Sequence, residues 1–123
     1  MKTAVIILGH GSKNSGAGDA VQRIAAEMKV LAGYGLVEHA FLQHTSPFLL
    51  DVLESCVKQQ AERIVIVPFF MQAGAHVTRD IPGLIEKARE RHPNVDIIVT
   101  DYAGAHPMMA KIVADLVQLK VGK

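Results

Sequence analysis

The sequence contains one cysteine in 123 residues, no tryptophan and few other aromatic side chains. The single cysteine, Cys56, excludes a disulfide within the chain, so we expect a protein of the reducing cytoplasm. No stretch reaches the roughly 20 apolar residues that a membrane-spanning helix needs, and no cleavage site of a secretory signal follows the first apolar run. A formal net charge of +1 also lacks the basic surplus of a protein that binds nucleic acid or a membrane surface.

Hydrophobic residues, in contrast, make up half of the chain. Such a composition is typical of a sheet buried on both faces, or of apolar surface kept for a partner. A chain of 123 residues is long enough for one sizeable core but not for two. We therefore expect a single domain over residues 1–123, without a linker or a low-complexity segment.

Four short apolar runs alternate with four longer stretches of helical periodicity. The runs predict strands near residues 4–9, 36–42, 63–68 and 95–100, each followed by an amphipathic helix. Because these helices have the length that parallel crossovers need, the order predicts an α/β, flavodoxin-like domain. It would consist of a four-stranded parallel sheet with helices on both faces, and with the first and third strands in the middle.

Prolines indicate where the three later helices begin. Ser46–Pro47 is expected to open the second helix, because serine caps helices and proline is favoured in the first turn. By the same rule Pro82 is expected in the first turn of the third helix, and His106–Pro107 is expected to open the last.

Side chains able to bind metal or exchange protons follow all four expected strands. The loops after parallel strands emerge at the carboxyl edge of a sheet, where open α/β folds bind their ligands. The residues that this edge should bring together are His10, Gln43, His44, His76, Tyr102 and His106. Two neutral imidazoles there would suit an exchangeable divalent ion such as iron, cobalt, nickel or zinc. The cysteine pair or closely spaced histidines of a closed structural zinc site are missing.

Simpler explanations exist for several of these residues. Gly9–His10–Gly11 is also what a plain strand-to-helix turn with an exposed polar residue would contain. His39 lies within a strand and suits packing, His92 suits the negative end of a helix dipole, and helix capping accounts for His106.

Three motifs occur in a distinctive order: Gly9-His10-Gly11-Ser12, then Pro68-Phe69-Phe70, then Gly74-x-His76-Val77-x-x-Asp80-Ile81-Pro82. Their order and spacing, over nearly the whole chain from Val5 to Met108, resemble the short sirohydrochlorin chelatases. These are the small class II chelatases of cobalamin and siroheme biosynthesis.

The resemblance implies a lyase that inserts a divalent metal, cobalt or alternatively iron or nickel, into sirohydrochlorin without an organic cofactor. It further implies that His10 and His76 hold the metal and accept the pyrrole protons. Lys13 and Arg79 could bind the carboxylates of this substrate, and Phe70 and Met71 could form an apolar wall for its ring. Solvation and core packing are the respective alternatives. The full set of expected substrate-binding residues is Ser12, Lys13, Gln43, His44, Phe70, Met71 and Arg79.

One position departs from the family, which often has glutamate where this chain has Gln43. Glutamine carries no charge and cannot act as a base. His44 could replace the glutamate only if the strand ends there and the chain turns, because neighbouring strand residues face opposite sides. Longer relatives contain two similar halves that face each other across the site, so the resemblance also implies a homodimer.

The sequence is also compatible with two other functions. The first is a metal or tetrapyrrole carrier that uses the same two histidines without turnover. The second is a phosphate-binding domain that uses the glycine-rich first loop. It is the weaker of the two, because neither G-x-G-x-x-G nor G-x-x-x-x-G-K-[ST] occurs in the chain.

Overall fold

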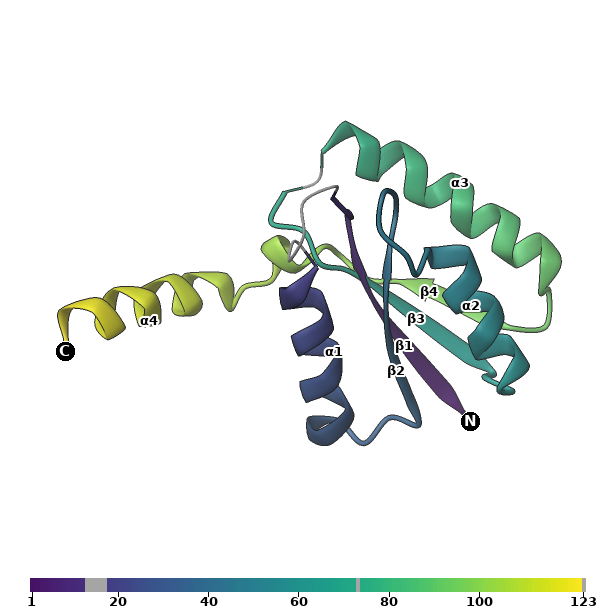
Figure 1. Ribbon diagram of the computed structural model, residues 1–123, viewed down its shortest axis with the longest axis horizontal. Coiled ribbons are helices and arrows are strands. Elements are labelled where there is room, and N and C mark those ends of the chain that lie inside the picture. Colours follow the sequence, from purple (N-terminus) through teal and green to yellow (C-terminus); the bar gives the residue numbers. More distant parts are fainter. Residues whose placement is uncertain (13–17, 73, 123) are drawn as a thin grey trace.

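Strands and helices alternate along the chain in the computed structural model, which describes residues 1–12, 18–72 and 74–122, without the side chains of residues 75–78 (Figure 1). The elements in order are β1 (Thr3–Gly9), α1 (Asp19–Leu31), β2 (Leu36–Phe41), α2 (Leu49–Lys58), β3 (Arg63–Pro68), α3 (Ala75–Arg91), β4 (Asp96–Val99), a 3₁₀ turn at Ala103–Ala105, and α4 (Met109–Val121).

The four strands form one parallel sheet in the order β2-β1-β3-β4. Ala4 of β1 pairs with Leu36 on one side and with Ile64 on the other. β1 is buried from Ala4 to Gly9, as its continuous apolar sequence requires of a central strand. The expected α/β fold, with the first and third strands in the middle, is confirmed.

One face of the sheet, which we call the closed face, is covered by α2 and α3. Alternate strand residues point to it, among them Ile6, Leu8 and Ile66, each with no exposed surface. Leu53 of α2 and Ile85 of α3 pack into the same cluster. This layer is the main hydrophobic core of the described chain.

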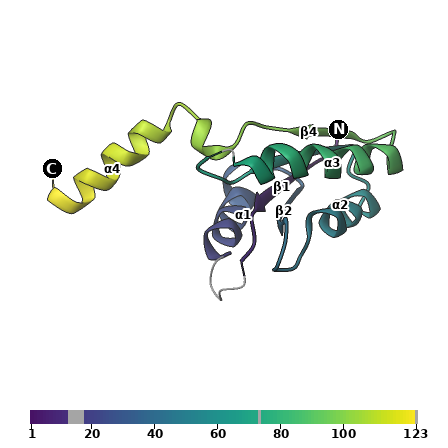
Figure 2. The ribbon, with the colours of Figure 1, turned by 90° about the horizontal axis from the view of Figure 1, so that it is seen from above.

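The opposite face, which we call the open face, carries α1, which packs mainly on β1 and β2. Val21 and Ala25 of α1 pack with Val5, Ile7 and other residues of these two strands. α4 is not on this face, because it projects away from the sheet in both views (Figures 1 and 2). None of the residues of α4 is buried.

The starts of α2 and α3 differ from the expectation based on proline. α2 begins at Leu49 with Phe48 as its N-cap, so Ser46–Pro47, joined by a cis peptide bond, precedes the helix. α3 begins at Ala75, and Pro82 therefore lies inside it. Burial of Ile81 and Ile85 on either side offsets the hydrogen bond that the exposed proline cannot donate.

The helices that the structure describes include none with the length and apolarity needed to cross a membrane.

Candidate functional site

His10 lies directly after β1, at the carboxyl edge of the sheet. Its ring packs on that of Phe70, with 4.1 Å between the ring centroids and 39° between the planes. Phe70 belongs to the core of the closed face and is only 4% exposed, whereas His10 is exposed. A rigid aromatic ring thus supports one side of an imidazole whose other side meets solvent.

The chain next to His10 is held by backbone bonds that continue beyond the paired strands. The Leu42 amide donates to the Gly9 carbonyl, and the Gln43 amide donates to the His10 carbonyl, both at 3.1 Å. Gly11 has a φ of +87°, and a Cβ on it would overlap the Gln43 carbonyl oxygen. Only glycine fits this corner, which therefore fixes Gln43 beside His10.

A hollow of about 370 Å³ opens between this corner and α3, and we call it the α3 hollow. The residues that line it are His10, Leu42, Gln43, Arg79, Asp80, Gly83, Leu84 and Lys87. Arg79 and Lys87 are two turns apart on the same side of α3, so both cations border one space. Asp80 lines the same space, so two cations face one carboxylate there, and the net positive charge suits a ligand rich in carboxylates.

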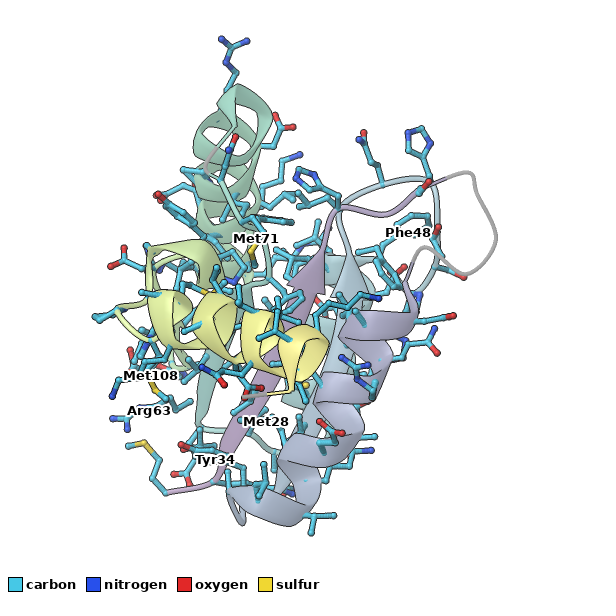
Figure 3. All side chains as sticks on the ribbon, turned by 90° about the vertical axis from the view of Figure 1, so that its left-hand side faces the viewer. Met28, Tyr34, Phe48, Arg63, Met71 and Met108 are labelled. Atoms are coloured by element: carbon cyan, nitrogen blue, oxygen red, sulfur yellow. The ribbon has the colours of Figure 1, made fainter. Side chains whose placement is uncertain are left out.

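A second hollow, of about 470 Å³, lies on the other side of His10, and we call it the Met71 hollow. Its lining consists of His10, Phe69, Phe70, Met71, Gln72 and Gly74. Met71 is 53% exposed and stands on the segment that follows β3 (Figure 3). Because His10 borders both hollows, one ligand could contact a cationic wall and an apolar wall on either side of the imidazole.

His76 is the second residue of α3, not part of the irregular loop that the sequence suggested. Gly74 precedes the helix in an extended conformation with ψ of 167° and acts as its N-cap. The His76 side chain lies outside the described part of the structure, as does the whole of Lys13. His76 therefore remains a ligand predicted from the resemblance.

Other residues expected at the edge are distributed differently. His44 is exposed, has a φ of 67° and is not among the residues that line the two hollows. Ser12 is held through its backbone, since the Thr45 hydroxyl donates to its carbonyl at 2.7 Å. The Nδ1 atom of His106 accepts a hydrogen bond of 3.0 Å from the Met108 amide, but Met108 is the N-cap of α4 and the helix begins at Met109, so His106–Pro107 precedes the helix instead of opening it.

His92 and Cys56 have structural roles and do not belong to the candidate site. His92 ends α3 and lies 2.8 Å from a carboxylate oxygen of Glu54 on α2, which Arg91 also approaches at 3.5 Å. The hydrogen bond with His92 is the main reason why the pKa of Glu54 is lowered, although desolvation opposes it. Burial raises the pKa of the Cys56 thiol to about 11, so it is not a thiolate ligand at neutral pH.

Lys87 is a lining residue that was not among the predicted site residues. The spacing of Arg79, Gly83 and Lys87 could have indicated it, because residues four apart lie on one side of a helix and here comprise two cations and a glycine. That signal becomes specific only once α3 is known to begin at Ala75 and to face His10. Among the side chains that the structure describes, which do not include that of His76, no three from His, Cys, Asp or Glu are grouped closely enough to hold a metal ion.

Comparisons with a family model and with known proteins agree on one family. The model of the CbiX family matches residues 4–119. The chain is 31% identical over 114 residues to the chloroplastic sirohydrochlorin ferrochelatase of Arabidopsis thaliana, covering 93% of this chain and 51% of that protein. It is 25% identical over 140 residues to the sirohydrochlorin cobaltochelatase of Methanopyrus kandleri, covering 98% of both chains.

A solved structure shows the same fold. The chain superposes with a TM-score of 0.85 on the sirohydrochlorin chelatase SirB from Bacillus subtilis subspecies spizizenii in complex with cobalt. The two are 30% identical, and the match covers 96% of this chain and 50% of that one. The chain thus spans about half the length of the Arabidopsis relative and of this chelatase.

Proposed function

Because this chain belongs to the CbiX family, we propose that it inserts a divalent metal ion into sirohydrochlorin. Cobalt is the proposed metal, with iron and nickel as alternatives, since similar proteins are named for cobalt and for iron. The observation that carries the proposal is the position of His10, supported by Phe70 on the rim shared by two hollows, in a chain that matches the family from residue 4 to 119.

His10 and His76 would hold the incoming metal as neutral imidazoles. Insertion replaces two pyrrole protons with one divalent cation, so total charge is conserved only if two protons leave the macrocycle. An imidazole nitrogen that gives up the metal regains a free lone pair and can then accept a proton. In this scheme the metal moves to the ring, and the released protons move to the two histidines and then to water.

The macrocycle would lie across His10, with its edge over α3. Arg79 and Lys87 would bind its carboxylates from the α3 hollow, and Lys13 and Ser12 would contribute from the first loop. Met71 offers an exposed apolar contact for the ring, whereas the buried Phe70 acts by holding His10 in place. This arrangement would bring the pyrrole nitrogens to the imidazole.

Gln43 would help orient ligands without adding charge. Its amide oxygen can accept a hydrogen bond or bind a metal weakly, but it cannot take up a proton at neutral pH. We propose that the site therefore releases metal readily, which favours handing the ion on over storing it.

Residues 1–123 would act as one catalytic domain in a reducing cytoplasm, and two copies would form a homodimer. The chain spans about half the length of two of its similar proteins, so a second copy supplies what a second half would. The symmetric pair would place two sets of edge residues in one assembly.

An anaerobic insertion assay tests the proposal. Sirohydrochlorin and the purified chain are mixed with cobalt, iron or nickel, and the absorbance change of the macrocycle gives initial rates. We expect saturable rates and many products per site. Binding of metal or macrocycle in a fixed ratio to protein, with no turnover with any of the three ions, would instead identify the carrier named above.

A further inference from the structure

Gly83 lies near the middle of α3, where a glycine is unfavourable. Glycine loses more backbone freedom on folding than any other residue and has no side chain to pack, so alanine suits a helix interior better. Pro82, directly before it, already removes one backbone hydrogen-bond donor from the helix. The sequence therefore places the two residues that weaken a helix most next to each other in the centre of α3.

No contact within the described structure requires a glycine at this position. Gly83 has the backbone of a regular helix, unlike Gly11, whose φ is 87°. A Cβ on Gly83 would meet no heavy atom within 4 Å, whereas one on Gly104 would overlap the Met71 carbonyl. Alanine would therefore fit at position 83 without strain and would stabilise α3. The fold alone does not explain why this residue is a glycine.

The space beside Gly83 belongs to the α3 hollow, which His10 also lines. Residues four apart lie on the same side of a helix, so Arg79, Gly83 and Lys87 form a row along the hollow. The rise of an α-helix puts the two cationic residues about 12 Å apart along its axis. Asp80 is also in the lining, and the hollow keeps a net positive charge. The row is thus cationic at both ends and bare in the middle.

The buried side of α3 holds the helix in place against the sheet. Ile81, Ile85 and Ala88 are at most 5% exposed and belong to the core of the closed face. Leu84 packs against the same core. An outward shift of α3 would expose these apolar side chains to water, which is unfavourable. A larger residue in place of Gly83 would therefore occupy the hollow itself.

We propose that Gly83 determines which ligands the α3 hollow admits, because its missing side chain lets the edge of a flat macrocycle lie against α3 between Arg79 and Lys87. The macrocycle is the substrate of the proposed function, on which this inference rests. Carboxylates around the edge of a planar ring can reach both cations only if nothing between the cations holds the ring away. A larger side chain at position 83 would keep the ring from His10, while a metal ion could still reach the imidazole.

Equilibrium binding of metal-free sirohydrochlorin to the full chain is the test, followed anaerobically by the fluorescence of the macrocycle. We expect Gly83→Leu to weaken this binding by about tenfold or more, the scale on which pocket size discriminates between ligands. Its melting temperature should not fall below the wild-type value, since leucine suits a helix better than glycine, and calorimetric binding of cobalt should be unchanged. Gly83→Gln, with a polar side chain of similar length, should weaken macrocycle binding equally, because size and not polarity decides.

Glu90→Leu is the matched control. Glu90 lies on the same side of α3, two turns after Gly83, but is not among the residues that line the hollow. Leucine there should leave macrocycle binding no weaker than in the wild type, and an equal loss from both leucines would overturn the inference. Wild-type macrocycle affinity in Gly83→Leu or Gly83→Gln would also overturn it and leave the proposed function standing. A wild-type chain that binds no sirohydrochlorin would overturn both.

Discussion

The two faces of the sheet are built from the same strands but differ in how far their side chains are buried. Along β3, Ile64 and Ile66 point to the closed face and have no exposed surface, whereas Val65 and Val67 point to the open face and are half-buried. In the middle of β3 the side chains are apolar on both sides, so the difference in their burial follows from the helices that cover each face. The closed face carries the main core and the wall of the candidate site, and the open face stays partly exposed over β3 and β4.

The first way to test this comparison is to remove the imidazole at the edge of the closed face. We expect His10→Ala to lower the rate of metal insertion by about 10²–10⁴-fold, the range in which acid–base side chains contribute. His10→Phe should lower it equally while keeping a ring against Phe70, which separates loss of the nitrogen from loss of packing. Anaerobic initial rates and circular dichroism are the measurements.

The matched control is His39→Ala, on β2 and outside both hollows, which should keep the wild-type rate. A His10→Ala variant with full activity would remove His10 from the mechanism and would place the chemistry elsewhere on the sheet.

The second test concerns stability on the two faces. Leu53 of α2 is 1% exposed in the closed face, so Leu53→Ala should lower the free energy of unfolding by about 2–5 kcal/mol. Leu31, at the end of α1, is 81% exposed, so Leu31→Ala should change it by less than about 0.5 kcal/mol. Urea unfolding followed by circular dichroism gives both values. Equal losses would mean that burial on the closed face does not decide what a leucine side chain contributes to stability.

The third test restores a charge in the α3 hollow. Gln43→Glu should strengthen divalent-metal binding by about 1–2 kcal/mol, because a charge-assisted contact replaces a neutral one. Titration calorimetry with cobalt measures this. In a double-mutant cycle with His44→Ala, the structure predicts additivity, since Gln43 lines the hollow and His44 does not. Strong coupling between the two changes would show that His44 reaches the metal.

Much of this architecture could be predicted from the sequence. The apolar run of β1 and the repeated βα pattern led to the correct sheet order, because local periodicity and crossover rules leave few topologies. His10 was found because it directly follows a buried strand. The start of α3 was predicted too late, because the rule for proline in first turns was outweighed by burial of Ile81 and Ile85.

What the sequence could not reveal depends on tertiary geometry. The contact of His10 with Phe70 joins residues 60 apart, and no local pattern encodes it. The role of Lys87 required the position of α3 relative to β1. The sequence predicted an amphipathic last helix but not its direction, since α4 projects away from the sheet and none of its residues is buried.

The smallest expected effect concerns the tie between the two helices of the closed face. Glu54 on α2 bonds to His92 at the end of α3, and this bond lowers the pKa of Glu54 below its ordinary value of 4.5. A carboxyl whose pKa is lower in the folded state stabilises the fold above its unfolded pKa, and the contribution disappears as the pH falls through the folded pKa. We therefore expect Glu54→Gln to melt below wild type at neutral pH, with the difference in Tm shrinking once the pH falls below 4.5. Glu90→Gln makes the same charge change on the exposed side of α3 and should show no such pH-dependent difference. If the Tm difference for Glu54→Gln stayed constant from neutral pH into acid, the pair would act by packing alone, and the charge on Glu54 would contribute nothing to joining α2 and α3.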